Sequence, residues 1–241
     1  MSILSLFRLC MRISGTMHKR VKQSQRLLLI CLCISMCLSA TSLMIQFHPE
    51  LFTLVERTYG AAAKTRVTQW QALLEAGQSQ DANQQLTLVN NFFNEFTFIS
   101  DQNHWDTLDY WATPIEFIGT NAGDCEDYSI AKYVSLRALG VREEQLRLVY
   151  VKALALNQAH MVLAYYASAQ AVPLILDNLT SDILPATKRT DLRFIYSFNG
   201  EGLWNAKAQG RGRKIQPGGN NRLWAELHRK IELQTPISIG E

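Results

Sequence analysis

The chain has 241 residues, with 24 basic and 21 acidic side chains and a formal net charge of +3. Its first 49 residues hold six basic and no acidic side chains, so the remainder has 18 basic and 21 acidic ones, a formal −3. This balance does not support a nucleic-acid partner for the body of the protein, because binding to phosphates needs a basic surface. The length of the body fits one domain with a core of its own.

The N-terminal segment has the pattern of an export signal. A basic stretch precedes the almost wholly apolar run from Leu27 to Ile45, which contains small residues at Ser39-Ala40. The run is also about long enough to span a bilayer, so an uncleaved anchor is the alternative. We assign residues 1–40 to a signal peptide or N-terminal membrane anchor and residues 41–241 to the exported domain.

The first half of the body is predicted to be helical. Helical spacing of apolar residues predicts a helix over residues 59–77 and a second one that Asp81 caps. The apolar positions of the second helix are Leu86, Val89, Phe92, Phe93 and Phe96. A third helix is predicted from Cys125 to Leu139, with Asp124 at its N-cap and Gly140 just past its end.

The second half is predicted to be a sheet. Four short runs rich in β-forming residues cover 146–151, 160–166, 172–177 and 192–197. Short connectors between the first three favour antiparallel pairing. A loop rich in Gly and Arg over residues 209–220 and a last helix over 221–233 complete the chain. Helices followed by strands predict an α+β domain with N-terminal helices packed on an antiparallel sheet.

Cys125 is the only cysteine that remains when the leader is removed. The other four are Cys10, Cys31, Cys33 and Cys37. A lone cysteine in an exported protein is either a small buried residue or a nucleophile. A helix N-terminus lowers the pKa of a thiol, and the backbone N–H of Cys125 is placed to help bind an oxyanion. The position therefore favours the nucleophile.

His160 is the predicted base and Asp177 the carboxylate that orients it. His160 lies 35 residues after Cys125 at the start of a predicted strand, and Asp177 lies 17 residues further, near the end of the next. Antiparallel neighbours would bring both to one end of the sheet, against the helix of Cys125. The four other histidines lack this setting: His18, His48, His104 and His228.

Three carboxylates surround the predicted nucleophile, at Asp124, Glu126 and Asp127. Their negative charge should raise the pKa of the thiol and oppose the thiolate. Either they cap the helix and face solvent, or a cation neutralises them. Oxygen ligands suit Ca²⁺, and Asp106 and Asp109 stand just upstream to complete a cage.

Two segments resemble the bacterial transglutaminase-like cysteine proteinases, the LapG family. They are Asp109-Tyr-Trp-Ala-Thr-Pro-Ile-Glu116 and Gly123-Asp-Cys-Glu-Asp-Tyr128. The histidine and aspartate motifs, His160-Met-Val-Leu and Leu176-Asp-Asn178, follow in the same order, and the resemblance extends over about residues 59–233. It implies a papain-like, transglutaminase-type fold in the periplasm.

The resemblance also implies roles for the site residues. Cys125 would be the nucleophile, His160 the base and Asp177 the orienting carboxylate. The family is calcium-dependent, which implies Ca²⁺ ligands beside the cysteine. These would be Asp124 and Asp127, with Glu126 and Asp106 as further candidates.

The family implies partners as well. Its members cleave a large surface adhesin near its N-terminus, at a di-alanine site, which releases the adhesin and disperses biofilm. An inner-membrane receptor for cyclic di-GMP sequesters the protease. Two alternatives stay open: a transglutaminase-type acyltransferase that uses the same triad, and a non-catalytic calcium-binding module that docks to an envelope receptor.

Overall fold

The computed structural model describes residues 45–205, 214–217, 222–234 and 237–239, within a compact unit that spans Met44–Glu241. The predicted leader over residues 1–40 lies outside the described residues and stays a prediction. Among the described helices, none has the length and apolar character that crossing a membrane requires.

Helices dominate the first half, as predicted. They are α2 (Pro49–Tyr59), α3 (Ala61–Gly77), α4 (Ala82–Asn94), α5 (Asp101–His104), α6 (Pro114–Thr120) and α7 (Cys125–Ala138), with α8 (Arg222–Gln234) near the C-terminus. The prediction of one helix over 59–77 was wrong at its start. Gly60 has φ +89° and separates α3 from α2, a helix that was not predicted.

The strands form one large antiparallel sheet and two small pairs. They are β1 (Ile45–Phe47), β2 (Thr97–Phe98), β3 (Ala122–Gly123), β4 (Leu146–Ala153), β5 (Gln158–Tyr165), β6 (Leu174–Leu176), β7 (Leu184–Pro185), β8 (Leu192–Asn199), β9 (Gly202–Asn205), β10 (Lys214–Pro217) and β11 (Ile237–Ile239). The order in the large sheet is β10-β9-β8-β4-β5-β6-β7, and β1 pairs with β11.

The four predicted strands correspond to β4, β5, β6 and β8, and the predicted antiparallel pairing of β4 with β5 and of β5 with β6 is confirmed. The predicted loop over 209–220 was wrong for Lys214–Pro217, which is strand β10 paired with β9. An edge strand with Pro and basic residues carries little of the alternating pattern that reveals a strand.

Local capping explains where the helices begin and end. Asp81 Oδ1 accepts a hydrogen bond from Gln84 N (3.0 Å), and Gln84 Oε1 accepts one from Asp81 N (3.1 Å), so α4 begins with a reciprocal capping box. Helix α4 ends at Asn94, which leaves Phe96 buried just beyond it rather than on the helix. Gly140, with φ +89°, follows the end of α7 as predicted.

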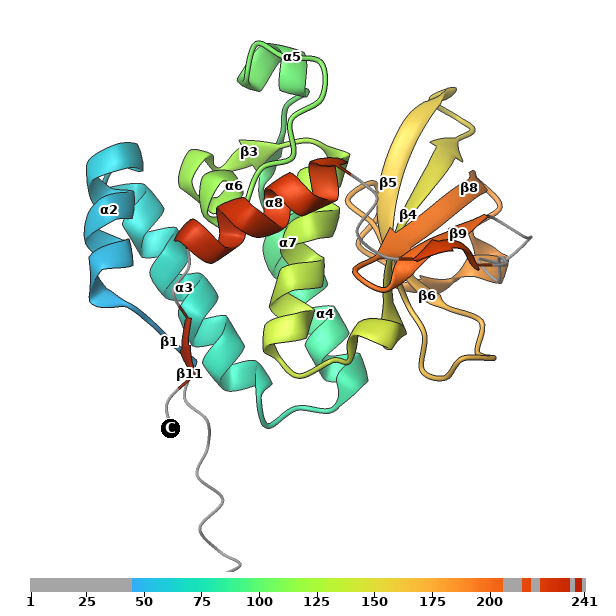
Figure 1. Cartoon of the computed structure of the whole chain (residues 1–241), viewed down its shortest axis with the longest axis horizontal. Coiled ribbons are helices and arrows are strands. Elements are labelled where there is room, and N and C mark those ends of the chain that lie inside the picture. The colour runs from blue at the N-terminus through green and yellow to red at the C-terminus, as the bar shows by residue number, and fades with distance from the viewer. Residues whose placement is uncertain (1–44, 206–213, 218–221, 235–236, 240–241) are drawn as a thin grey trace, which may run out of the picture. The chain divides into compact units, whose positions relative to one another are not determined.

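Helix α7 lies at the centre of the fold. It packs against β5 on one side and against α4 and α6 on the other, and Figure 1 shows the helices gathered on one side of the sheet. Ile130 and Leu136 of α7 are fully buried, and Trp70 Nε1 of α3 donates a hydrogen bond to Ser135 Oγ (2.8 Å). The far face of the sheet has its own apolar cluster, which includes Val151 and Val162.

The start of α7 is fixed by the short parallel pair of β2 and β3. Thr97 pairs with Ala122 and Phe98 with Gly123, so the segment after α4 holds the residues just before Cys125. Gly123 is packed so closely that a Cβ there would lie 2.4 Å from Asp127 Oδ2 and 2.7 Å from Phe117 Cδ2. A larger residue would push the start of the helix out of place.

If α7 is the central core helix, Leu136→Ala should cost roughly 2–5 kcal/mol of unfolding free energy, because it leaves a cavity at a fully buried position. Leu108→Ala, at a side chain that is 88% exposed, is the matched control and should change stability by less than about 0.5 kcal/mol. Urea unfolding measures both variants, and equal losses would contradict the placement of α7.

Candidate active site

Cys125 is the first residue of α7, and its thiol is half-buried. The thiol donates a hydrogen bond to Glu126 Oε2 (2.9 Å), and the backbone of Met161 also hydrogen bonds to the sulfur. One turn further along α7, Ser129 Oγ donates to Met161 O (3.1 Å). The helix start is therefore fastened to β5 at the residue that follows His160.

His160 and Asp177 form a buried pair. His160 is the third residue of β5, Asp177 follows β6, and Nε2 of the imidazole lies 2.7 Å from Asp177 Oδ1. Both side chains are nearly or wholly inaccessible to solvent. An ionised carboxylate only accepts hydrogen bonds, so the imidazole carries its proton on Nε2 and leaves Nδ1 free to act as a base.

Asp177 stays ionised despite its burial. Burial alone would raise its pKa, but hydrogen bonds from His160, from Leu179 N (3.0 Å) and from Arg189 outweigh it and lower the pKa to about 2. The structure thus brings two of the three predicted catalytic residues into direct contact and places the third beside the neighbouring residue, Met161.

Five carboxylates gather at the start of α7. Oxygen atoms of Asp101, Asp124 and Asp127 lie within 4.8 Å of one another, and the same holds for Asp101, Asp109 and Glu126. We call these five residues the acidic cluster. Asp124 and Glu126 also share such a group with the sulfur of Cys125.

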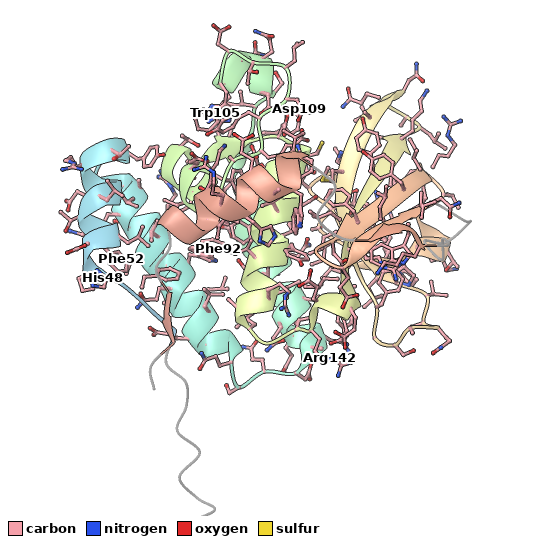
Figure 2. All side chains as sticks on the ribbon, viewed as in Figure 1. His48, Phe52, Phe92, Trp105, Asp109 and Arg142 are labelled. Atoms are coloured by element: carbon pink, nitrogen blue, oxygen red, sulfur yellow. The ribbon has the colours of Figure 1, made fainter. Side chains whose placement is uncertain are left out.

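Asp106 is not among these groups. Its carboxylate accepts a hydrogen bond from Gln102 Nε2 (3.3 Å), and its backbone has φ +53° in the turn after α5. The structure instead supplies Asp101, which the sequence analysis did not single out, together with Asp109. Figure 2 labels Asp109 and Trp105 in the segment that follows α5.

Asp127 is the fully buried member of the acidic cluster. Its Oδ1 accepts a hydrogen bond from Ala112 N (2.8 Å), and its Oδ2 accepts one from Asp124 N (3.2 Å). The carboxylate therefore ties the segment before α6 to the N-cap of α7. It fixes the position of Asp124 as well as adding negative charge.

The acidic cluster is electrostatically unfavourable by itself. Burial raises the pKa of Asp101 to about 6, and burial together with the charge of Glu126 raises the pKa of Asp124 to about 8. Burial and the charge of Glu126 likewise raise the pKa of the Cys125 thiol well above its usual value. The helix start alone therefore does not produce a thiolate, contrary to what the position of Cys125 suggested.

The donor set fits a hard cation. Asp101 Oδ1 and Asp124 Oδ1 are buried and have no hydrogen-bond partner within the described part of the chain. No lysine or arginine of that part forms an ion pair with a member of the acidic cluster. Several carboxylate oxygens without a positive partner are the ligands that Ca²⁺ takes in proteins.

Sequence reasoning missed Asp101 because nothing near it in the chain marks it. It stands 23 residues before Asp124, in a four-residue helix, and only the fold joins the two. Its Oδ2 accepts a hydrogen bond from Tyr110 N, which closes the loop that carries Asp109. An acidic residue in the first turn of a short helix is common, so the pattern alone carried no signal of a ligand.

In this site a cysteine at the start of a core helix packs on the strand that carries His160, and the imidazole contacts Asp177, which follows the neighbouring strand. This arrangement is typical of the transglutaminase-like cysteine proteinases. Residues 61–209 match the family described as "Bacterial transglutaminase-like cysteine proteinase BTLCP". The chain belongs to this family, as predicted. A comparison with the curated proteins gives no match.

Solved structures of LapG from Legionella pneumophila agree with the assignment. The calcium-bound form is 40% identical to this chain over 76% of its length and 98% of the LapG chain, with a TM-score of 0.66. The EGTA-treated form gives the same identity and TM-score and covers 96% of the LapG chain. The α+β, transglutaminase-like fold predicted from the sequence is confirmed.

The depressed pKa of Asp177 predicts a dependence of stability on pH. A carboxylate with a lowered folded pKa stabilises the fold above its unfolded value of about 3.9, and this contribution, about 2–3 kcal/mol, is lost as pH falls toward about 2. The free energy of unfolding, measured with urea between about pH 5 and 2, should fall more steeply with decreasing pH for the wild type than for Asp177→Asn. Parallel curves would show that Asp177 has an ordinary pKa.

Proposed function

We propose that the protein is a calcium-dependent cysteine endopeptidase of the periplasm, with Cys125 as nucleophile, His160 as base and Asp177 as the orienting carboxylate. The observation that carries this proposal is the 2.7 Å contact between His160 and Asp177 on the strand to which the start of α7 is fastened. Membership of a cysteine proteinase family supports the reaction type.

The chemistry follows from the protonation states. Nδ1 of His160 takes the thiol proton, and the sulfur of Cys125 attacks the carbon of a peptide carbonyl. The C–N bond then breaks, and the amine leaves with the proton from His160. Water, deprotonated by the same imidazole, attacks the thioester and restores the thiol. Asp177 holds the imidazole in one tautomer and stabilises its charged form throughout.

For the metal, we propose that Asp101, Asp109, Asp124 and Glu126 hold Ca²⁺, with Asp127 fixing the backbone of Asp124. A bound Ca²⁺ offsets the negative charge beside the thiol, which favours the thiolate. The relative solved in a calcium-bound form supports this choice of ion. We do not assign Asp106 to the ligand set, because its carboxylate lies outside the acidic cluster.

We propose the substrate and the regulator on the resemblance to the LapG family. The substrate is the N-terminal region of a large surface adhesin, cut at a di-alanine site, and the cut releases the adhesin and disperses biofilm. The regulator is an inner-membrane receptor for cyclic di-GMP. The exported location follows from the predicted leader and places the enzyme where such an adhesin is anchored.

Cys125→Ala should abolish cleavage of a recombinant adhesin N-terminal fragment that contains a di-alanine site, with a loss of at least about 1000-fold in kcat/KM. The measurement is the appearance of the two fragments on a gel. Full cleavage by the variant would overturn the proposal. Incorporation of a labelled amine into a glutamine substrate, in place of peptide cleavage, would favour the transglutaminase alternative.

Removal of calcium with EGTA should abolish cleavage, and added Ca²⁺ should restore it. Glu126→Gln should weaken calcium binding in calorimetry, because one charged ligand is lost at the centre of the acidic cluster. Glu144→Gln, at an exposed glutamate paired with Arg142, is the control and should bind calcium like the wild type. Cleavage that is equally fast with and without Ca²⁺ would contradict the proposed calcium dependence.

A further inference from the structure

Asp177 has a second charged partner besides His160. Nη2 of Arg189 lies 2.6 Å from Asp177 Oδ2, while Oδ1 accepts the hydrogen bonds from His160 and Leu179 N. The Arg189 side chain is 3% exposed and that of Asp177 is wholly buried. Each oxygen of the carboxylate therefore has its own donor, and the plane of the carboxylate is set by both.

Arg189 is itself held rigidly. Its Nε lies 2.9 Å from Asp191 Oδ1, and its Nη2 lies 2.7 Å from Asp191 Oδ2. This bidentate contact fixes the plane of the guanidinium. The backbone beside it is tied to the β4–β5 hairpin, because Leu154 N donates to Asp191 O (2.8 Å). His160, Asp177, Arg189 and Asp191 thus form a line of groups that joins the strand of the base to the loop before β8.

The opposite side of Asp177 is fixed through its backbone. Asn94 Nδ2 donates to Asp177 O (2.9 Å), and the buried Lys132 Nζ of α7 donates to Asn94 Oδ1 (2.6 Å). With the backbone held in this way, the remaining freedom of Asp177 is rotation of its carboxylate. Arg189, on Oδ2, removes this freedom together with the donors on Oδ1.

We propose that Arg189 is a positioning residue for the catalytic machinery, which aligns the carboxylate of Asp177 with His160 and keeps it ionised while the imidazole is neutral. This inference rests on the proposed function, since it takes His160 as the base. A neutral imidazole gives a buried carboxylate no compensating charge, and the guanidinium, in direct contact with Asp177, supplies one that does not titrate. The imidazole then keeps its proton on Nε2 before the reaction starts.

The shape of the guanidinium is part of the inference. One planar fork contacts both Asp177 and Asp191, whereas an ammonium group is a point charge on a flexible stem. Charge alone would be kept by Arg189→Lys, but alignment would not. The expected order of activity is therefore wild type, then Arg189→Lys, then Arg189→Gln.

The kinetic test compares these variants as full-length, calcium-loaded protein on the adhesin fragment. Arg189→Gln should lower kcat roughly 10- to 100-fold with KM changed by less than about twofold, because alignment of the base and not substrate binding is lost. Arg193→Gln, at an exposed arginine four residues along the chain, is the control and should match the wild type. Guanidinium, at concentrations well below those that unfold the protein, should restore activity to Arg189→Ala, and urea should not.

A substrate-free measurement separates this inference from the proposed function. The proton on His160 Nε2, held by a buried carboxylate, should give a downfield proton NMR signal in the wild type that is lost in Arg189→Gln. An unchanged signal with wild-type kcat in Arg189→Gln would overturn the inference while leaving the triad intact. If Arg189→Gln does not fold, Arg189→Lys decides: a wild-type kcat and signal would overturn the inference, and a reduced kcat in a stable protein would support it.

Discussion

The buried carboxylate of Asp127 is the constraint on which the site depends. It accepts backbone hydrogen bonds from Ala112 and from Asp124, and so joins the segment before α6 to the start of α7. Gly123 must be a glycine for this contact, since a Cβ would meet the same carboxylate at 2.4 Å. Cys125 lies two residues after Gly123, so its position is set by this joint between the segment before α6 and the start of α7.

The same joint creates an electrostatic problem at the start of α7. It gathers the acidic cluster at the start of α7, where Asp124 and Glu126 lie beside the thiol of Cys125 and burial already disfavours charge. Asp177, the proposed orienting carboxylate, is in the opposite situation, because its hydrogen-bond partners lower its pKa to about 2. Asp177 is therefore ionised and hydrogen bonded to His160, whereas negative charge beside Cys125 disfavours the thiolate. A bound cation can neutralise that charge.

Periodic features of the fold could be predicted from the sequence, and joints between distant segments could not. The helix of Cys125 and strands β4 and β5 have apolar patterns and end signals of their own, so their bounds were nearly right. The break at Gly60 and strand β10 lack such patterns. The triad could be proposed from order and spacing because adjacent strands must meet.

Asp101 and Arg189 are different, because only the folded chain brings Asp101 to Asp124 and Arg189 to Asp177. The acidic neighbours of Cys125 suggested a metal from local sequence alone. In the structure the carboxylate of Asp101 joins the acidic cluster, that of Asp106 lies outside the groups of neighbouring carboxylates, and that of Asp127 accepts backbone hydrogen bonds. Local sequence could therefore indicate the kind of site but not all of its residues.

The most direct test of the account is the rate at which iodoacetamide alkylates Cys125 at neutral pH, followed by mass spectrometry of the peptide that carries it. Alkylation should be slow in EGTA and fast with Ca²⁺, and the calcium effect should be smaller in Asp124→Asn, where a proposed ligand and a repelling charge are both removed. Equal rates with and without Ca²⁺ in the wild type would contradict control of the thiol by the acidic cluster.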